Sequence, residues 1–231
     1  MKICGLTKST LLDYPGRVAC TIFLGGCNFR CPFCHNSSLV LESSIQPTYT
    51  SDEILKFLQK RKGILDGVCI SGGEPTLQVH LADFLLQIKE LGYAVKLDTN
   101  GTQPEVLCRL LQDHLVDKIA MDIKTSPEKY PLLCGISSPD MSAVNESVRL
   151  IMQEAPDYEF RTTVVKELHT REDFEQIGQW LSGARAYYLQ AYKDSESVLQ
   201  PGFHSFSKEE LEEFRKLLSA SISLVEIRGI N

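Results

Sequence analysis

Three closely spaced cysteines constrain this chain more than any other feature. They lie in the segment Gly25-Gly-Cys27-Asn-Phe-Arg-Cys31-Pro-Phe-Cys34-His-Asn36, which directly follows a β-rich apolar run. A loop after a strand is therefore expected to carry all three thiols. A fully ligated 4Fe–4S cluster has four cysteines, so three thiolates would leave one iron without a protein ligand. We expect such a cluster here, with one iron open for chemistry, as catalytic zinc keeps one position open.

Two alternatives remain open on the spacing alone. Cys27, Cys31, Cys34 and His35 could bind a structural zinc ion, although adjacent ligands strain a closed tetrahedron and zinc ligands normally come in two separated pairs. Cys31 and Cys34 could also form a thioredoxin-like C-x-x-C redox pair. Of the three interpretations, the spacing favours the iron–sulfur cluster.

Composition narrows the class of protein further. The chain has 231 residues and eight cysteines but no apolar leader, so reduced thiols and a cytoplasmic location are expected in place of a disulfide framework. The net charge of −6 argues against a nucleic-acid partner. No apolar run approaches the roughly 20 residues that span a bilayer. The five other cysteines lack cluster spacing and are expected to be buried thiols: Cys4, Cys20, Cys69, Cys108 and Cys134.

β-rich runs alternate with amphipathic helical patterns along the chain. The predicted strands are Val18–Leu24, Gly67–Ser71, Ala94–Asp98, Lys118–Ile123, Glu159–Val165, Ala186–Ala191 and Ser223–Ile227. A helix is predicted at Val79–Leu91; N-caps are expected at Ser51, Thr170 and Ser207, and helix ends at Gly63, Gly92 and Gly183. Glu42–Thr50 is expected to be a polar loop.

Six βα units followed by a final strand predict an α/β fold, a partial (β/α)6 barrel of the TIM type. A doubly wound open sheet is the alternative. We expect residues 1–231 to form one domain, with residues 1–16 as an N-terminal extension of a barrel core at 17–231.

Polar residues gather where the predicted strands end. The second strand runs into Ser71-Gly72-Gly73-Glu74-Pro75, where the glycines let a ligand approach the backbone and Glu74 offers an acceptor to an amine. The later strands contribute Asp98 to Asn100, Asp122 to Lys124, Arg161 and Gln190. The carboxyl ends of barrel strands form the active site, so these residues are expected to meet there. The alternative for the two aspartates is a structural salt bridge to Lys124 or Arg161.

These motifs resemble the radical S-adenosylmethionine (SAM) superfamily: the C-x3-C-x2-C loop has the aromatic Phe33 before its last cysteine, and GGEP follows one βα unit later. The resemblance covers nearly the whole chain. It implies a partial (β/α)6 barrel with one 4Fe–4S cluster, on which SAM is chelated and reductively cleaved to methionine and a 5′-deoxyadenosyl radical. That radical then takes a hydrogen atom from the substrate.

Cys34-His35-Asn36 and Asp98-Thr-Asn-Gly101 are similar to the glycyl-radical-enzyme activating branch. This resemblance implies a monovalent cation, Na+ or K+, at Asp98, Thr99 and Asp122. It also implies that SAM contacts come from residues of the loop and of the strand ends. These are Phe33, His35, Gly72, Gly73, Glu74, Asp98, Asn100, Asp122, Lys124, Arg161 and Gln190. The branch has a histidine near the end of the sixth strand, where this chain carries Gln190.

The opening Gly5-Leu-Thr-Lys-Ser-Thr-Leu-Leu-Asp-Tyr-Pro-Gly16 most resembles activating proteins of anaerobic ribonucleoside-triphosphate reductases. The implied partners are a glycyl radical enzyme as protein substrate and a flavodoxin- or ferredoxin-like electron donor. Two other hypotheses are a radical SAM enzyme acting on a small molecule or peptide, and a non-catalytic metal-binding protein.

Overall fold

Eight strands form one sheet in the order of their numbers in a computed structural model that describes residues 1–41, 46 and 48–230. The strands are β1 Ile3–Thr10, β2 Ala19–Leu24, β3 Gly67–Gly72, β4 Ala94–Thr99, β5 Lys118–Asp122, β6 Tyr158–Val164, β7 Ala186–Ala191 and β8 Leu224–Arg228. From β2 to β8 each strand pairs in parallel with the next. Each of the seven predicted strands is present, with its ends within one residue of the prediction.

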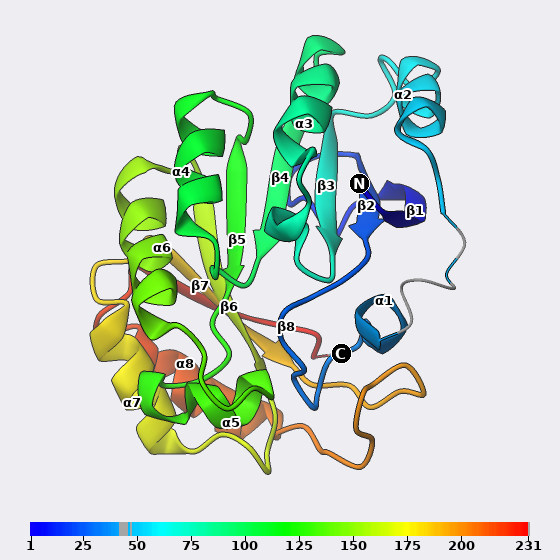
Figure 1. Ribbon diagram of the computed structural model, residues 1–231. Coiled ribbons are helices and arrows are strands. Elements are labelled where there is room, and N and C mark those ends of the chain that lie inside the picture. Colours follow the sequence, from blue (N-terminus) through cyan, green and yellow to red (C-terminus); the bar gives the residue numbers. More distant parts are fainter. Residues whose placement is uncertain (42–45, 47, 231) are drawn as a thin grey trace.

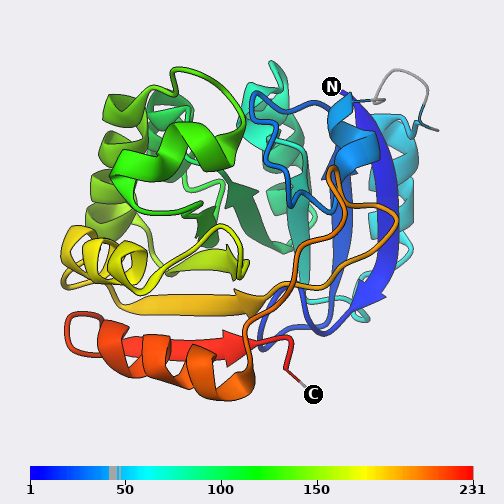
Figure 2. The same ribbon diagram turned by 90° about the horizontal axis from the view of Figure 1, so that it is seen from below.

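The sheet curves around a common interior but does not close. Figure 2 shows the strands along an open curve, with β1 and β8 at its two ends. The predicted partial barrel is confirmed, and the doubly wound alternative is wrong because the larger helices cover only the outer face (Figure 1). The helices are α1 Ser37–Leu41, α2 Ser51–Gln59, α3 Leu81–Glu90, α4 Pro104–Gln112, α5 Tyr130–Cys134, α6 Met141–Glu154, α7 Arg171–Trp180 and α8 Lys208–Leu218, with short 3-10 turns at Pro75–Leu77 and Pro127–Lys129.

The first sixteen residues contain a strand that the sequence did not predict. β1 pairs antiparallel with β2, with Ile3 opposite Leu24 and Thr10 opposite Ala19. Only its first residues are buried, and the later ones face solvent. A half-exposed edge strand has a weak apolar pattern, which explains why the sequence left this segment as an extension.

Local signals set most of the helix boundaries. Ser207 caps α8 by accepting from the Glu210 N–H, and Thr170 forms a capping box with Asp173. The cap of α2 is Thr50, one residue before the predicted Ser51. The three predicted glycine stops all have positive φ, which a residue without Cβ adopts freely: Gly63, Gly92 and Gly183. Of the predicted loop Glu42–Thr50, residues 42–45 and 47 lie outside the described residues.

Candidate active site

One cavity of about 440 Å³ opens at the carboxyl ends of the strands. It is lined by Asp13, Cys27, Phe29, Cys31, Phe33, Cys34, His35, Asn36, Val40, Ser71, Gly72, Gly73, Asp98, Thr99, Asn100, Asp122, Lys124, Arg161, Thr163 and Gln190. All the predicted site residues except Glu74 are therefore brought together.

The loop between β2 and α1 carries the three thiols and is held at both ends. The Gly25 N–H donates to the carbonyl of Lys2, just before β1 (3.0 Å), and the Gly26 N–H donates to Leu39 O (2.8 Å). From the other side, the strap, residues 193–204 between β7 and α8, pairs with the loop through main-chain bonds. Leu199 N–H donates to Cys34 O (3.0 Å) in this pairing. The loop geometry is thus set by distant parts of the chain.

Two glycines, the last residue of β3 and the residue after it, pack directly against this loop. A Cβ on Gly72 would lie 2.3 Å from the Leu24 carbonyl oxygen, and one on Gly73 would lie 2.0 Å from that of Gly26. Gly72 also has a φ of 118°. The close approach lets Gly73 N–H donate to Leu24 O and Glu74 N–H donate to Gly26 O, each at 2.8 Å. Only glycine fits both positions, and the turn is fixed beside the thiols.

Glu74 does not line the cavity, contrary to the predicted contact with a bound amine. Its side chain is 1% exposed and accepts from Thr76, from the Thr99 hydroxyl (2.8 Å) and from the Asn100 N–H (2.6 Å). Burial raises the pKa of this carboxyl, opposed by the hydrogen bonds it accepts. Glu74 therefore ties the end of β3 to the end of β4, which positions Asn100.

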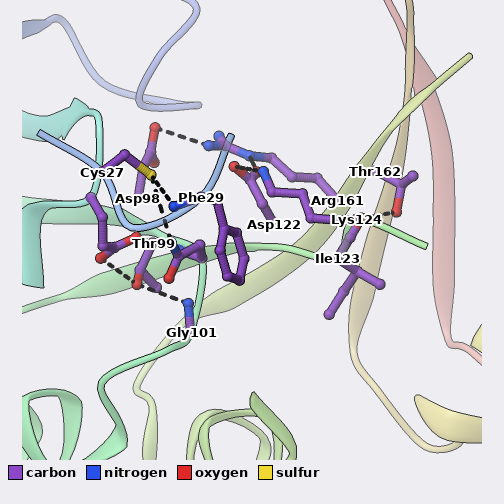
Figure 3. A network of polar contacts seen from close by, with 12 residues as sticks. Cys27, Phe29, Asp98, Thr99, Gly101, Asp122, Ile123, Lys124, Arg161 and Thr162 are labelled. Carbon is purple, nitrogen blue, oxygen red and sulfur yellow. Dashed lines mark hydrogen bonds and ion pairs between the residues drawn. The ribbon is translucent and has the colours of Figure 1, made fainter. Parts of the chain in front are cut away.

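Five charged side chains form a strand-end cluster: Lys96, Asp98, Asp122, Lys124 and Arg161. Figure 3 shows Arg161 between the two aspartates. Its Nη2 lies 3.1 Å from Asp98 Oδ2 and its Nε lies 2.5 Å from Asp122 Oδ1. Lys124 Nζ reaches Asp122 Oδ2 at 3.0 Å, and Lys96 Nζ contacts Asp98 Oδ1. The predicted salt bridges between these residues are present.

The electrostatics of this cluster keep its members ionised. Burial alone would raise the pKa of Asp98, but the charges of Arg161 and Lys96 outweigh it and hold that pKa below its usual range. Burial likewise opposes the shift at Asp122, where Arg161 and Lys124 lower the pKa strongly. Three cations therefore face two carboxylates, which leaves one surplus positive charge beside the cavity. An anionic group is the ligand that such a site favours.

The thiols meet the requirements of a cluster better than those of a single metal ion. Among the described residues, no three histidine, cysteine, aspartate or glutamate side chains converge on one ion position. His35 Nε2 is instead 2.6 Å from the Lys193 carbonyl oxygen. Thiols spread around one cavity suit the larger cubane, and the donor set is the one that iron–sulfur clusters use. The arrangement of these side chains therefore does not support tetrahedral coordination of zinc by Cys27, Cys31, Cys34 and His35.

Hydrogen-bond donors also point at one of the sulfurs. The Phe29 N–H lies 3.4 Å from Cys27 Sγ, and Asn100 Nδ2 lies 3.9 Å from it. Such donors stabilise a metal-bound thiolate. Of the cysteines outside the loop, Cys4, Cys20, Cys69 and Cys134 are buried as predicted, whereas Cys108 is partly exposed on α4.

Sequence reasoning missed several residues of this region, among them Lys96, Thr163 and Asp13. Lys96 lies inside β4 and is 1% exposed, and its charge in a buried strand was the available signal. Thr163 follows Arg161 on the same face of β6. Asp13 precedes β2 and accepts a hydrogen bond from Thr21 Oγ1 (2.5 Å), and no spacing rule pointed to it.

The known proteins to which this chain is similar agree with the site described above. The family model described as "Radical SAM superfamily" matches residues 21–181. The chain therefore belongs to the radical SAM superfamily. Over 238 aligned residues it is 33% identical to the "Putative glycyl-radical enzyme activating enzyme" of Methanocaldococcus jannaschii, covering 99% of this chain and 96% of that protein. Within the superfamily, the chain is thus an enzyme of the glycyl-radical-enzyme activating family.

One further likeness concerns the family and another concerns the fold alone. The chain is 27% identical to the pyruvate formate-lyase-activating enzyme of Streptococcus mutans, covering 78% of this chain and 73% of that one. The crystal structure of Streptococcus suis SuiB bound to S-adenosylmethionine superposes with a TM-score of 0.68 at 14% identity, covering 91% of this chain. The chain spans 52% of SuiB, and this likeness concerns the fold.

Proposed function

We propose that this protein activates an anaerobic ribonucleoside-triphosphate reductase by abstracting a hydrogen atom from a glycine of that enzyme. The observation that carries the proposal is the meeting of three thiols, a glycine turn and a surplus positive charge in one cavity. When bound at Cys27, Cys31 and Cys34, a 4Fe–4S cluster supplies the electron that splits SAM into methionine and a 5′-deoxyadenosyl radical, which becomes 5′-deoxyadenosine by taking the glycine hydrogen.

Different residues of the cavity bind different parts of SAM. Lys124 and Arg161 provide the positive charge that neutralises the SAM carboxylate. The backbone at Gly72 and Gly73 lies against the SAM amino group, because no Cβ keeps a ligand away. Other cavity residues contact the remaining parts of SAM, namely Phe33, His35, Asn100 and Gln190.

One cavity residue is better suited to the substrate. Asp13 lies outside the strand-end cluster and comes from the connection between β1 and β2, at one edge of the open sheet. Its carboxylate accepts from Thr21 and retains capacity for another donor. We assign it to a peptide N–H of the glycine-bearing segment, which enters where the barrel is open.

The choice of target rests on the opening segment, residues 5–16, and its resemblance to activating proteins of anaerobic ribonucleotide reductases. A flavodoxin- or ferredoxin-like protein is the proposed electron donor. Among the described residues there is no helix with the length and apolarity needed to cross a bilayer. We place the reaction in the cytoplasm, where such donors operate.

The test is one anaerobic incubation of reconstituted protein, SAM, reductant and the anaerobic reductase from the same source. A glycyl-type doublet in the electron paramagnetic resonance spectrum, with a matching amount of 5′-deoxyadenosine, is expected. Deoxyadenosine without a protein radical would reject this target and favour a small molecule or another protein as substrate. No deoxyadenosine at all would contradict radical SAM chemistry.

Matched variants distinguish the residues that support SAM cleavage from those that bind the protein substrate. Cys27→Ala should abolish SAM cleavage, whereas Cys108→Ala, which removes a thiol on the outer helix α4, should leave it unchanged. Asp13→Asn should reduce radical formation on the reductase at least tenfold while SAM cleavage without the partner continues. If radical formation and SAM cleavage fell equally, Asp13 would have a role in binding SAM and not the protein substrate.

A further inference from the structure

The aspartates expected to hold a monovalent cation already have protein cations on all their oxygens. Asp98 Oδ1 contacts Lys96 Nζ, and Asp98 Oδ2 accepts from Ser71 Oγ (2.9 Å) and lies 3.1 Å from Arg161 Nη2. Asp122 Oδ1 accepts from Arg161 Nε and Asp122 Oδ2 from Lys124 Nζ. A small cation bound here would have to displace one of these groups.

The third expected ligand is engaged as well. The Thr99 hydroxyl donates to Glu74 Oε1 at 2.8 Å, and its oxygen accepts from the Gly101 N–H at 3.1 Å. Thr99 is 2% exposed, and these two bonds orient its hydroxyl toward the Glu74 side. The expected set of Asp98, Thr99 and Asp122 is therefore committed to bonds within the chain.

Lys96 is the feature that makes this arrangement unusual. It lies two residues before Asp98 on the same face of β4, so its ammonium rises from inside the barrel toward the carboxylate. Its side chain is 2% exposed, and its remaining polar neighbour is Cys69 Sγ at 3.8 Å. A buried ammonium is tolerated only with a charged partner, and here that partner is Asp98.

The balance of charges in the strand-end cluster also disfavours an added cation. With Lys96, Lys124 and Arg161 facing Asp98 and Asp122, the cluster carries one surplus positive charge, and one carboxylate of a ligand neutralises it. An added Na+ or K+ would raise the surplus positive charge among these side chains from one to two. Like charges in a buried site repel strongly.

We propose that Lys96 and Arg161 take the place of a bound Na+ or K+, so that SAM binding by this chain requires no monovalent cation. The inference rests on the proposed function, because it concerns the site assigned to SAM. Lys96 and Arg161 stabilise the two aspartates from within the barrel, and the ligand carboxylate completes the charge balance.

The first test measures the SAM dissociation constant of reconstituted wild-type protein in KCl, NaCl and choline chloride at equal ionic strength. Choline is too large to occupy a site between two aspartates. Values within twofold of each other are expected. A loss of affinity of tenfold or more in choline chloride would overturn the proposal, since it would show that a small cation is needed.

Lys96→Ala gives the complementary test. This substitution frees Asp98 Oδ1 and leaves space below it, so SAM affinity in choline chloride should fall at least tenfold and recover at least fivefold in KCl or NaCl. Lys118→Ala is the matched control, because Lys118 also contacts buried acid in the barrel but lies outside the cavity. Its SAM affinity should not depend on the cation. The same weak binding of Lys96→Ala in all three salts would overturn the proposal.

A measurement without cofactors separates this inference from the proposed function. In protein without the iron–sulfur cluster, the midpoint of thermal unfolding of wild type should be the same in the three salts. The midpoint of Lys96→Ala, also without the iron–sulfur cluster, should be higher in KCl or NaCl than in choline chloride. If wild type bound SAM in none of the salts, the proposed function would fall, and the cluster-free midpoints would still decide whether Lys96 replaces a cation.

Discussion

Two groups of charged side chains on the barrel strands and their ends differ in charge balance and in access to the cavity. The strand-end cluster borders the cavity and has three cations for two carboxylates. The second group, here the Glu159 cluster, consists of Lys118, Asp157, Glu159 and Arg228, none of which lines the cavity. In it two cations face two carboxylates.

The geometry of the Glu159 cluster is that of a closed structural unit. Arg228 binds both oxygens of Glu159, at 2.7 and 3.1 Å, and Lys118 approaches at 3.4 Å. The Arg228 guanidinium also lies 3.3 Å from the centre of the Tyr188 ring. Glu159 is fully buried and every charge has its partner. In this molecule a surplus charge beside a cavity marks a binding site, whereas a balanced set of ion pairs away from the cavity marks a structural one.

Glu159→Gln should produce the largest effect and should affect stability alone. The change leaves Arg228 without its carboxylate partner and leaves Lys118 with Asp157 alone, and breaking a buried pair lowers the free energy of unfolding by about 3 kcal/mol. Chemical denaturation of the cluster-free protein measures this loss. SAM affinity of the folded variant should stay within threefold of wild type. A weakening of SAM binding by tenfold would break the division between the two groups.

Lys124→Met tests the strand-end cluster, the group that borders the cavity. The ammonium supplies the surplus charge, and a charge-assisted hydrogen bond is worth roughly 1.5–3 kcal/mol, so the SAM dissociation constant should rise about 10- to 100-fold. The same substitution at Lys118, the first residue of β5, should reduce stability and leave SAM binding unchanged. Equilibrium binding of SAM to both variants gives the answer, and equal effects would show that cavity access is irrelevant.

The smallest effect concerns pH. Burial opposes the ionised form of Glu159, but Arg228 and the nearby lysines hold its pKa below the ordinary value of 4.5. Its stabilisation is therefore complete above pH 4.5 and is lost as pH falls through the lowered pKa. The difference in unfolding free energy between wild type and Glu159→Gln should shrink as pH decreases below 4.5. A constant difference down to pH 3 would contradict the assigned role of Glu159.

The sequence predicts the barrel well because its signals are local. Apolar runs of five to seven residues and helix caps fix the parallel strands, and the cysteine spacing fixes the loop. β1 was not predicted because an edge strand packs on one side only. The strand ends could be expected to meet, since parallel strands place their carboxyl ends at one edge.

Side-chain partners could not be predicted to the same degree. The pairing of Asp122 with Arg161 depends on the register of β5 and β6, which places these two residues opposite each other. The direction of the Glu74 side chain depends on donors supplied by Thr99 and Asn100, a whole βα unit later. Asp13 reaches the cavity from an irregular segment, where residue patterns carry no information about direction.

The strap has a consequence for the timing of biosynthesis. His35 binds the carbonyl of Lys193, which lies 158 residues further along the chain, and Leu199 binds Cys34. A ribosome adds roughly 5–20 residues per second, so the thiol loop emerges about eight to thirty seconds before the segment that covers it. During that interval the thiols are open to iron, oxidants and chaperones alike. The strap can therefore enclose the metal site only after residues 193–204 have been synthesised.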